Sequence, residues 1–173
     1  MARTKFNSDK KQQLGQFMTP LNLCKDLIKK YTFKITDRIL EPSMGDGNFI
    51  IAIIEKFINE VYTDKSESTI NKINKILTTN LSGVELDKEL FEQCKINVKK
   101  YFNIDPDVNL ICNFHQTDFL LWESVINNRF DYVIGNPPFG GTIDLKIQEK
   151  LDKKYGNRYD KKIKKETYSF FII

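Results

Sequence analysis

The sequence predicts one α/β domain built on a parallel β-sheet. Short apolar segments of strand type alternate with longer segments whose apolar residues recur at helical spacing. The chain has 173 residues, which is enough for one ordinary domain with a hydrophobic core. Apolar residues make up 40% and charged residues 29%, a globular composition rather than a disordered one.

Helices and strands are expected to alternate along the chain. The segments with apolar residues at helical spacing predict helices at Leu21–Lys30, Asn48–Val61, Ser66–Leu77 and Lys88–Tyr101. The short apolar segments predict strands at Arg38–Glu41, Leu81–Leu86, Val108–Cys112 and Tyr132–Gly135. This alternation is typical of a parallel sheet with helices on both faces. Ligands bind at the carboxyl ends of the strands in such sheets, and an unusual cluster of residues follows each expected strand.

The first cluster links the first strand to the next helix. Gly45 and Gly47 predict a tight turn over Met44–Gly47 that lets the backbone approach a ligand closely. Glu41 precedes this turn and Asp46 lies inside it. Two carboxylates suit a cationic group better than a pyrophosphate, so the cluster favours a cofactor that carries an ammonium group.

The second and third clusters follow the next two strands. Glu85 ends the second strand, where an acid can accept hydrogen bonds from both hydroxyls of a ribose. The spacing from the glycine turn to Glu85 exceeds the usual ~20 residues, and the helix expected at Ser66–Leu77 accounts for the difference. Asp118 can accept a hydrogen bond from the exocyclic amine of adenine while Phe119 packs beside the base. Taken alone, Glu85 also fits a surface acid, and Phe119 a core residue.

The fourth cluster, Asn136-Pro137-Pro138-Phe139, is the most specific. Two consecutive prolines fix two φ angles, and Asn136 before them is held extended. The resulting rigid turn presents two acceptors, the Asn136 side-chain oxygen and the Pro137 carbonyl, beside an aromatic ring. Two acceptors aimed at the hydrogens of an aromatic amine localise its lone pair for attack on a methyl group. Such catalysis depends on positioning and electrostatics and needs no metal or histidine.

No metal site is expected. His115 is the single histidine, and Cys24, Cys94 and Cys112 form no CxxC pair, so they are expected to be reduced thiols. No apolar run reaches the ~18–20 residues of a membrane span, and the polar, basic start lacks a secretory signal. A soluble, cytoplasmic protein without a membrane partner is expected.

Basic residues gather at the two ends of the chain. Residues 1–30 hold seven Lys/Arg against two acids, and residues 146–165 hold nine against three. The rest of the chain is acidic, with eleven basic residues against eighteen acids. The basic ends fit either solvated faces or contacts with nucleic-acid phosphates.

Together the four clusters resemble the motifs of amino-methyltransferases that use S-adenosylmethionine. Within these, the chain looks like the N6-adenine DNA methyltransferases of restriction–modification type. The segment Gly15-Gln16-Phe17-Met18-Thr19-Pro20 is similar to the family's N-terminal motif, which closes over the methionine part of the cofactor. This motif, the glycine turn and NPPF come in the order of the gamma subgroup. The resemblance covers roughly residues 12–140 and continues less closely through Lys165–Ile173.

The resemblance implies a Rossmann-like class I methyltransferase fold and a role for each matching residue. S-adenosylmethionine would be bound by Met18, Thr19, Pro20, Glu41, Pro42, Ser43, Gly45, Gly47, Glu85, Leu86, Asp118 and Phe119. The target adenine, flipped out of DNA, would be held by Asn136, Pro137, Pro138 and Phe139. Two positions depart mildly from the family pattern: Met44 stands where Cys or Ala is usual, and Phe139 where Tyr is commoner.

Other readings of the same motifs stay open. N4-cytosine methyltransferases use the same chemistry but usually begin the catalytic turn with Ser, so Asn136 favours adenine. Methyltransferases of RNA or of protein glutamine also carry NPPY-like turns. The chain could instead be a non-catalytic remnant that binds the cofactor or DNA.

The short length of the chain is the reason for considering a non-catalytic remnant. The fold that the chain resembles has seven strands in the order 3-2-1-4-5-7-6, whereas the sequence of 173 residues supplies four. Residues 1–173 are therefore expected to be the N-terminal part of the catalytic domain, truncated after strand 4, from a truncated gene or a split enzyme. A second chain would then supply the missing strands and the recognition of the target sequence. Strand 4 would be left as an exposed apolar edge.

Overall fold

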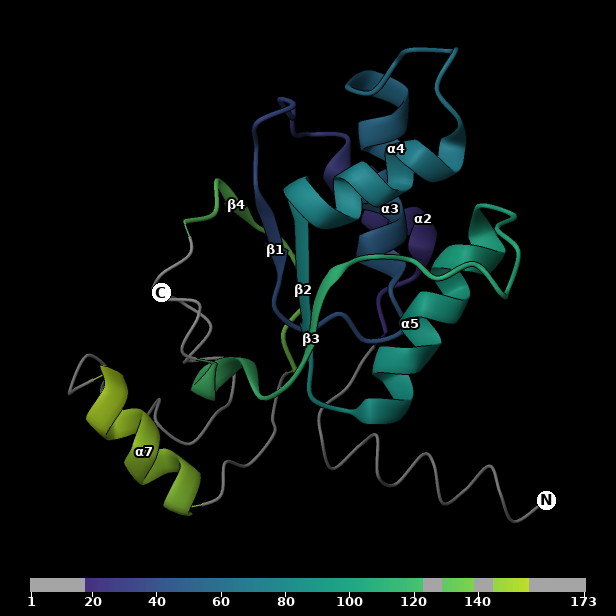
Figure 1. The fold of residues 1–173 in the computed structure, drawn as a ribbon. Coiled ribbons are helices and arrows are strands. Elements are labelled where there is room, and N and C mark those ends of the chain that lie inside the picture. The colour runs from purple at the N-terminus through teal and green to yellow at the C-terminus, as the bar shows by residue number, and fades with distance from the viewer. Residues whose placement is uncertain (1–17, 123–128, 139–144, 156–173) are drawn as a thin grey trace. The chain divides into compact units, whose positions relative to one another are not determined.

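Four parallel strands form the sheet. The computed structural model describes residues 18–122, 129–138 and 145–155. The strands are β1 (Ile39–Glu41), β2 (Leu81–Glu85), β3 (Asn113–Gln116) and β4 (Tyr132–Val133). They lie in the order β3-β2-β1-β4 (Figure 1), and every neighbouring pair is parallel. This confirms the order expected for the first four strands.

The chain direction across the sheet reverses beside β1. The steps from β1 to β2 and from β2 to β3 run the same way, whereas β4 pairs with the other side of β1. A reversal of this kind is a topological switch point, where doubly wound sheets bind their ligands. The carboxyl ends of β1 and β4 are therefore the place to look for a site.

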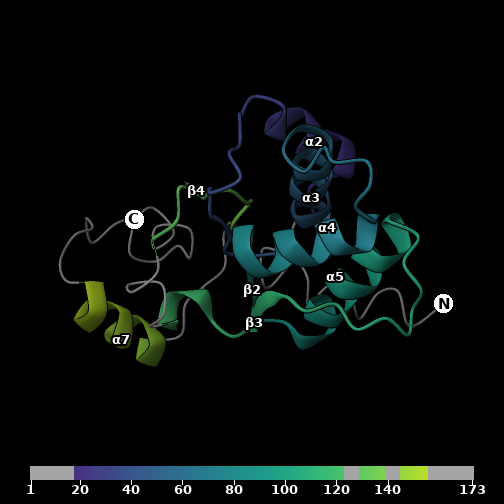
Figure 2. The same ribbon diagram turned by 45° about the horizontal axis from the view of Figure 1, so that its top comes forward.

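Four helices accompany these strands. They are α2 (Leu21–Ile28), α3 (Asn48–Glu60), α4 (Thr69–Lys75) and α5 (Lys88–Tyr101). Right-handed crossovers that step in one direction put their helices on one face of the sheet, and α3, α4 and α5 lie together there with α2 beside α3 (Figure 2). A 3-10 turn, η2 (Phe119–Leu121), follows β3.

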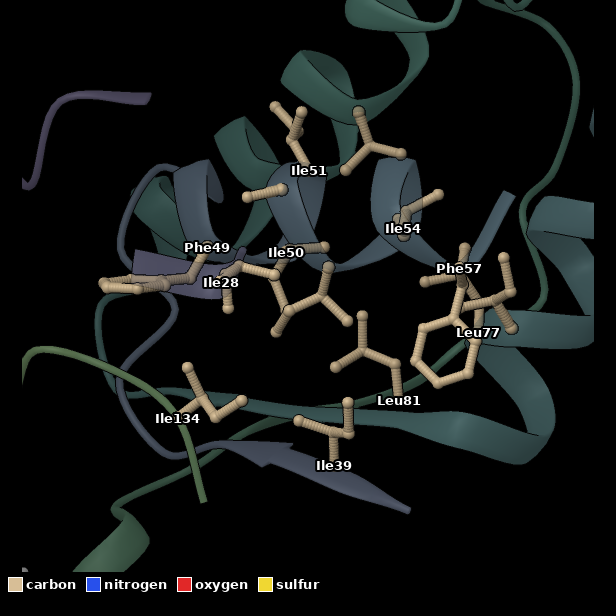
Figure 3. Close-up of a cluster of buried hydrophobic side chains, with 14 of the residues drawn as sticks. Ile28, Ile39, Phe49, Ile50, Ile51, Ile54, Phe57, Leu77, Leu81 and Ile134 are labelled. Carbon is tan, nitrogen blue, oxygen red and sulfur yellow. The ribbon is translucent and has the colours of Figure 1, made fainter. Parts of the chain in front are cut away.

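The core lies between α3 and the sheet. Figure 3 shows Ile50, Ile54 and Phe57 of α3 among the side chains of Ile39 and Leu81, which come from β1 and β2. All five are fully buried. Helix α3 is apolar on most of its circumference because α2, α4 and α5 also pack against it.

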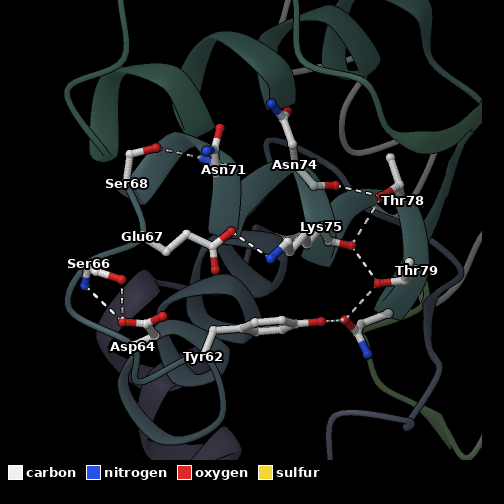
Figure 4. Close-up of polar contacts among 11 residues, drawn as sticks. Tyr62, Asp64, Ser66, Glu67, Ser68, Asn71, Asn74, Lys75, Thr78 and Thr79 are labelled. Atoms are coloured by element: carbon white, nitrogen blue, oxygen red, sulfur yellow. Dashed lines mark hydrogen bonds and ion pairs between the residues drawn. The ribbon is translucent and has the colours of Figure 1, made fainter.

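Helix α4 ends in a π-helical turn, η1 (Ile76–Asn80). The hydroxyl of Thr78 donates to the carbonyl of Asn74 at 2.7 Å, and that of Thr79 donates to the carbonyl of Lys75 at 2.6 Å (Figure 4). Hydroxyls that bond back to the preceding turn compete with regular α-helical hydrogen bonds. Asn80 then ends the turn, since its side-chain amide donates to two carbonyls of the loop before β1.

The predicted third strand, Val108–Cys112, is wrong. The strand forms directly after the predicted segment, at Asn113–Gln116, and Ser82 pairs with Asn113. The apolar run instead forms the approach to the sheet, where Leu110 is buried and Ile111 is exposed. Among the described residues β3 pairs with β2 only, and its three polar residues, Asn113, His115 and Gln116, are exposed, while Phe114 packs half-buried against the core. The apolar residues therefore identified the segment that packs against the core, whereas the segment that pairs with β2 comes directly after it.

The other elements form where they were predicted, with boundaries shifted by a few residues. Helix α2 ends at Ile28 instead of Lys30, and α4 begins after the cap residue Ser68, whose hydroxyl accepts from the backbone N–H of Asn71. Strand β4 covers only Tyr132–Val133, and Val133 is exposed.

The described residues divide into two units. The first is residues 18–136, which hold the sheet and the helices above. The second includes Pro137, Pro138 and helix α7 (Leu145–Tyr155), in which Leu151 is buried while Lys150 and Lys153 are exposed. Among the described residues, no helix has the length and apolar character needed to cross a membrane.

Candidate functional site

The turn after β1 requires both of its glycines. Gly45 has φ of 55° and Gly47 has φ of 93°, in the left-handed region that side chains disfavour. The backbone N–H of Gly47 donates to the carbonyl of Met44 at 3.0 Å, which confirms the predicted tight turn. A Cβ on Gly45 would lie 2.7 Å from the sulfur of Met18, and one on Gly47 would lie 2.6 Å from the sulfur of Cys94. The turn is therefore closely packed and cannot accept larger residues unchanged.

Glu41, at the end of β1, is a buried carboxyl group. It is 1% exposed and accepts hydrogen bonds from the backbone N–H of Ser43 at 3.0 Å and from the Ser43 hydroxyl at 3.3 Å. Burial raises its pKa to about 8, although the Ser43 hydrogen bonds oppose the shift and the nearby Glu85 adds to it. No Lys or Arg among the described residues pairs with it. A buried carboxyl group without a cationic partner can bind a cation favourably, because the cation stabilises its ionised form.

Glu85, at the end of β2, is tied to the same turn. One carboxyl oxygen accepts from the backbone N–H of Gly45 at 2.8 Å, and the other accepts from the N–H of Asp87 at 2.8 Å. Burial raises the pKa of Glu85 as well. The N–H of Leu86 also bonds to this carboxylate. Each carboxylate oxygen has two acceptor positions, so capacity remains for a ribose hydroxyl of the kind that the sequence predicts here.

Asn136 lies beside the same strand ends. Its side-chain N–H donates to the hydroxyl of Thr19 at 3.1 Å, and its main-chain carbonyl accepts from the hydroxyl of Ser43 at 3.3 Å. Asn48, at the start of α3, donates to the main-chain carbonyl of Thr19 at 3.1 Å. Three predicted site residues that are distant in sequence therefore form one hydrogen-bonded group.

The remaining predicted cofactor residues follow β2 and β3. The carboxylate of Asp118 accepts from the backbone N–H of Leu120 at 2.9 Å and so caps the η2 turn. Phe119 is 6% exposed, whereas Leu86 after β2 is 58% exposed. Leu86 thus has apolar surface available for a ligand, while the ring of Phe119 is mostly packed within the protein.

Predicted residues at the beginning of the site have structural roles of their own. Met18 packs on Gly45, and the carbonyl of Pro20 accepts the first hydrogen bond of α2 from Cys24 at 3.1 Å. Pro42, the residue after Glu41, is buried. Pro137 and Pro138 belong to the other unit, and Phe139 lies outside the described residues.

Three residues near the site escaped the sequence reasoning. Gly135 lies against Glu41, because a Cβ on it would come within 2.2 Å of the Glu41 Oε1 atom. Asn48 holds Thr19, and Cys94 packs under Gly47. A glycine directly before Asn136 at the end of a strand is a signal of close approach that the sequence does carry. Nothing in the sequence marks Asn48 or Cys94.

The donor set fits S-adenosylmethionine. The buried carboxyl group of Glu41 lacks a cationic partner among the described residues and could take an ammonium group. Glu85 and Asp118 offer acceptors at the next two strand ends, and Leu86 offers exposed apolar surface.

Comparison with known proteins points the same way. A family model described as N-6 DNA Methylase matches residues 3–173. The chain is 31% identical over 130 residues to the type II methyltransferase M.BstVI of Geobacillus stearothermophilus, covering 70% of this chain and 22% of that protein. It is 28% identical over 139 residues to the modification methylase CviBIII of Paramecium bursaria Chlorella virus NC1A, covering 76% of this chain and 27% of that protein. The chain therefore spans about a quarter of the length of these curated relatives.

Solved structures share the fold. The chain matches the protein of the DrdV–DNA complex with a TM-score of 0.59 at 19% identity, over 96% of this chain and 19% of that one. It matches the EcoKI M protein of a type I restriction enzyme with a TM-score of 0.50 at 19% identity, over 73% of this chain and 26% of that one. The parallel sheet, the site at its switch point and the family match lead to one conclusion: the chain belongs to the N-6 DNA methylase family of class I methyltransferases, whose cofactor is S-adenosylmethionine.

Proposed function

We propose that this chain forms the cofactor-binding and amine-binding part of a DNA methyltransferase that methylates the N6 amine of adenine. The observation that carries the proposal is the hydrogen-bonded group at the switch point. There the single hydroxyl hydrogen of Ser43 has two acceptors in reach, the buried carboxyl of Glu41 and the main-chain carbonyl of Asn136, each 3.3 Å from the Ser43 oxygen. A residue suited to a cation and a residue suited to an amine thus share one neighbour.

The cofactor would be held at the ends of three strands. Glu41 would accept from the ammonium group, Glu85 from the ribose hydroxyls, and Asp118 from the adenine amine, with Leu86 against the ring. Thr19 and Met18 would lie at the methionine end. When bound, S-adenosylmethionine supplies an electrophilic methyl group.

The target amine would be held by Asn136 and Pro137. The Asn136 side-chain oxygen and the Pro137 carbonyl would each accept one of its hydrogens, which favours a pyramidal nitrogen with a localised lone pair. Phe139 would stack on the base after it leaves the duplex. Neither acceptor is a base strong enough to retain a proton, so the proton released on methylation passes to water.

The test is nucleoside analysis of unmethylated duplex DNA incubated with the protein and S-adenosylmethionine. The proposal predicts N6-methyladenine, and it predicts that Asn136→Ala removes this product while calorimetry shows cofactor affinity within about threefold of wild type. N4-methylcytosine, or methylation of RNA alone, would contradict the adenine assignment. Cofactor binding without any methylated product would support the non-catalytic alternative for this chain.

A further inference from the structure

Thr19 and Ser43 each form a hydrogen bond with Asn136, one to its side chain and one to its main chain. The Thr19 hydroxyl oxygen accepts from the side-chain N–H of Asn136 at 3.1 Å, across 117 residues of sequence. The Ser43 hydroxyl lies 3.3 Å from the main-chain oxygen of Asn136. One contact restrains the side-chain amide, and the other restrains the peptide group that leads into Pro137.

Thr19 is itself fixed by the protein. Its main-chain carbonyl accepts from the side-chain N–H of Asn48 at 3.1 Å and lies 3.7 Å from the thiol of Cys24. Asn48 begins α3, the central helix of the core, and Cys24 is buried in α2. Contacts with two packed helices, α2 and α3, therefore hold in place the residue whose hydroxyl bonds to Asn136.

The amide of Asn136 benefits from such a restraint. Its two ends are similar in shape but opposite in hydrogen bonding, because the oxygen accepts and the nitrogen donates. Rotation of the amide by half a turn would present N–H groups to an amine that needs an acceptor. When the nitrogen bonds to Thr19, the oxygen lies at the other end of the amide group.

We propose that Thr19 and Ser43 are positioning residues for Asn136, in addition to any contact that they make with the cofactor. Thr19 restrains the side-chain amide with its nitrogen toward the Thr19 hydroxyl, and Ser43 restrains the peptide group before Pro137. The effect on methyl transfer rests on the proposed function, whereas the two contacts with Asn136 do not.

The first experiment does not require methyl transfer. In protein labelled with ¹⁵N at asparagine, the Asn136 side-chain amide is assigned by its loss in Asn136→Ala, and its exchange with solvent is measured. We expect Thr19→Val to accelerate this exchange about tenfold, since the removed hydroxyl was the acceptor, while Thr19→Ser leaves it within about twofold. The Asn48 amide is the internal control, because its acceptor is a main-chain carbonyl that both variants keep. Equal exchange in wild type and Thr19→Val would overturn the inference.

The second experiment separates positioning from cofactor binding. Single-turnover methyl transfer to DNA is measured at saturating S-adenosylmethionine, beside the cofactor dissociation constant. Because the cofactor is saturating, any effect of the variants on cofactor affinity does not enter this rate. We expect Thr19→Val and Ser43→Ala to slow the reaction about 10- to 100-fold, and Thr19→Ser to restore the rate. Weaker cofactor binding with an unchanged rate at saturation would reduce both residues to cofactor contacts and overturn the inference. If wild type yields no methylated product, the proposed function fails, and the amide exchange still decides the positioning role.

Discussion

Glu41 is an acidic residue almost completely removed from water. Its carboxyl is buried, and burial raises its pKa to about 8 from an ordinary value of 4.5. Between these two values the folded protein keeps a proton that the unfolded chain releases. The contribution of Glu41 to the free energy of unfolding therefore falls as the pH rises from about 4.5 to about 8. An ammonium group bound beside the carboxyl would remove this penalty by favouring the ionised form.

The first prediction compares wild type with Glu41→Gln by urea unfolding between pH 5 and pH 8. Glutamine keeps an acceptor for Ser43 but never ionises, so we expect the stability difference to shift in favour of the variant by ~3 kcal/mol over this range. Other groups also titrate, and the difference between the two proteins isolates Glu41. A difference that stays constant with pH would show that Glu41 titrates normally.

The second prediction concerns Gly47→Ala. Alanine at φ of 93° is strained, and its Cβ would lie 2.6 Å from the Cys94 sulfur. We expect a loss of ~2–4 kcal/mol in the free energy of unfolding, measured by denaturant titration. In a Cys94→Ala background the same change should cost ~1 kcal/mol less, because the sulfur is gone. Strictly additive effects of the two changes would refute the steric part of this explanation.

Individual site residues can be predicted from the sequence where the residue type is unusual for its position. Glycines in a turn and an acid at a strand end could be found because their chemistry is unusual there. Asn48 and Cys94 could not, because each acts through a partner that only the fold brings close. The burial of Phe119 likewise depends on packing, which the motif does not encode.

Among the helices, α2 is held to the core by a polar cluster. Lys25 of α2 bonds to Glu55 of α3 at 2.8 Å and to the hydroxyl of Tyr101 of α5 at 2.5 Å. The Tyr101 hydroxyl donates to Glu55 at 2.6 Å. Burial acts to raise the pKa of Glu55, but the hydrogen bonds from Lys25 and Tyr101 outweigh it and lower that pKa. The cluster joins three helices and so steadies the segment that begins with Thr19.

The third prediction is that Tyr101→Phe destabilises the protein by ~1–2 kcal/mol, because Glu55 and Lys25 lose a shared partner in partly buried surroundings. Thermal and denaturant unfolding measure the change. Tyr31→Phe is the matched control, since the hydroxyl of Tyr31 makes no hydrogen bond within the described residues. If both variants lost the same stability, the cluster would have no special role.

Element positions could be predicted where apolar periodicity and pairing coincide. Helix α5 forms over the predicted residues, Lys88–Tyr101, because its cap residue Asp87 and its apolar face agree. Strand β3 could not be located, since its polar residues pair at one side of the sheet while the apolar run before it packs. The π-helical turn also lacks a pattern in apolar spacing, because it depends on hydroxyls that bond to the backbone.

For the whole chain, the sheet order followed from the motifs and not from apolar spacing. The resemblance fixed which strands neighbour β1, and the structure confirms that β2 and β4 flank it. The charge distribution is the other property at this scale. Helix α7 belongs to the basic segment and exposes Lys150 and Lys153, whereas the middle of the chain is acidic.

The fourth prediction uses this contrast. Replacing Lys150 and Lys153 with Glu should weaken DNA binding and reduce the slope of log affinity against log salt by about two, if each lysine contacts a phosphate. Lys65→Glu with Lys100→Glu is the control, because these lysines are exposed in the first unit and the net charge changes equally. Fluorescence anisotropy at several salt concentrations measures both. Equal losses in the two pairs would leave only a non-specific effect of net charge.

The most direct test of the cofactor site is calorimetric titration of the folded chain with S-adenosylmethionine at pH 7, in two buffers of different ionisation enthalpy. Glu41, with a pKa of about 8, is mostly protonated at this pH and must ionise to pair with the ammonium group. We therefore predict saturable binding at one site with the release of nearly one proton, and no proton release in Glu41→Gln. Absence of binding to the folded chain would contradict the assignment of this site.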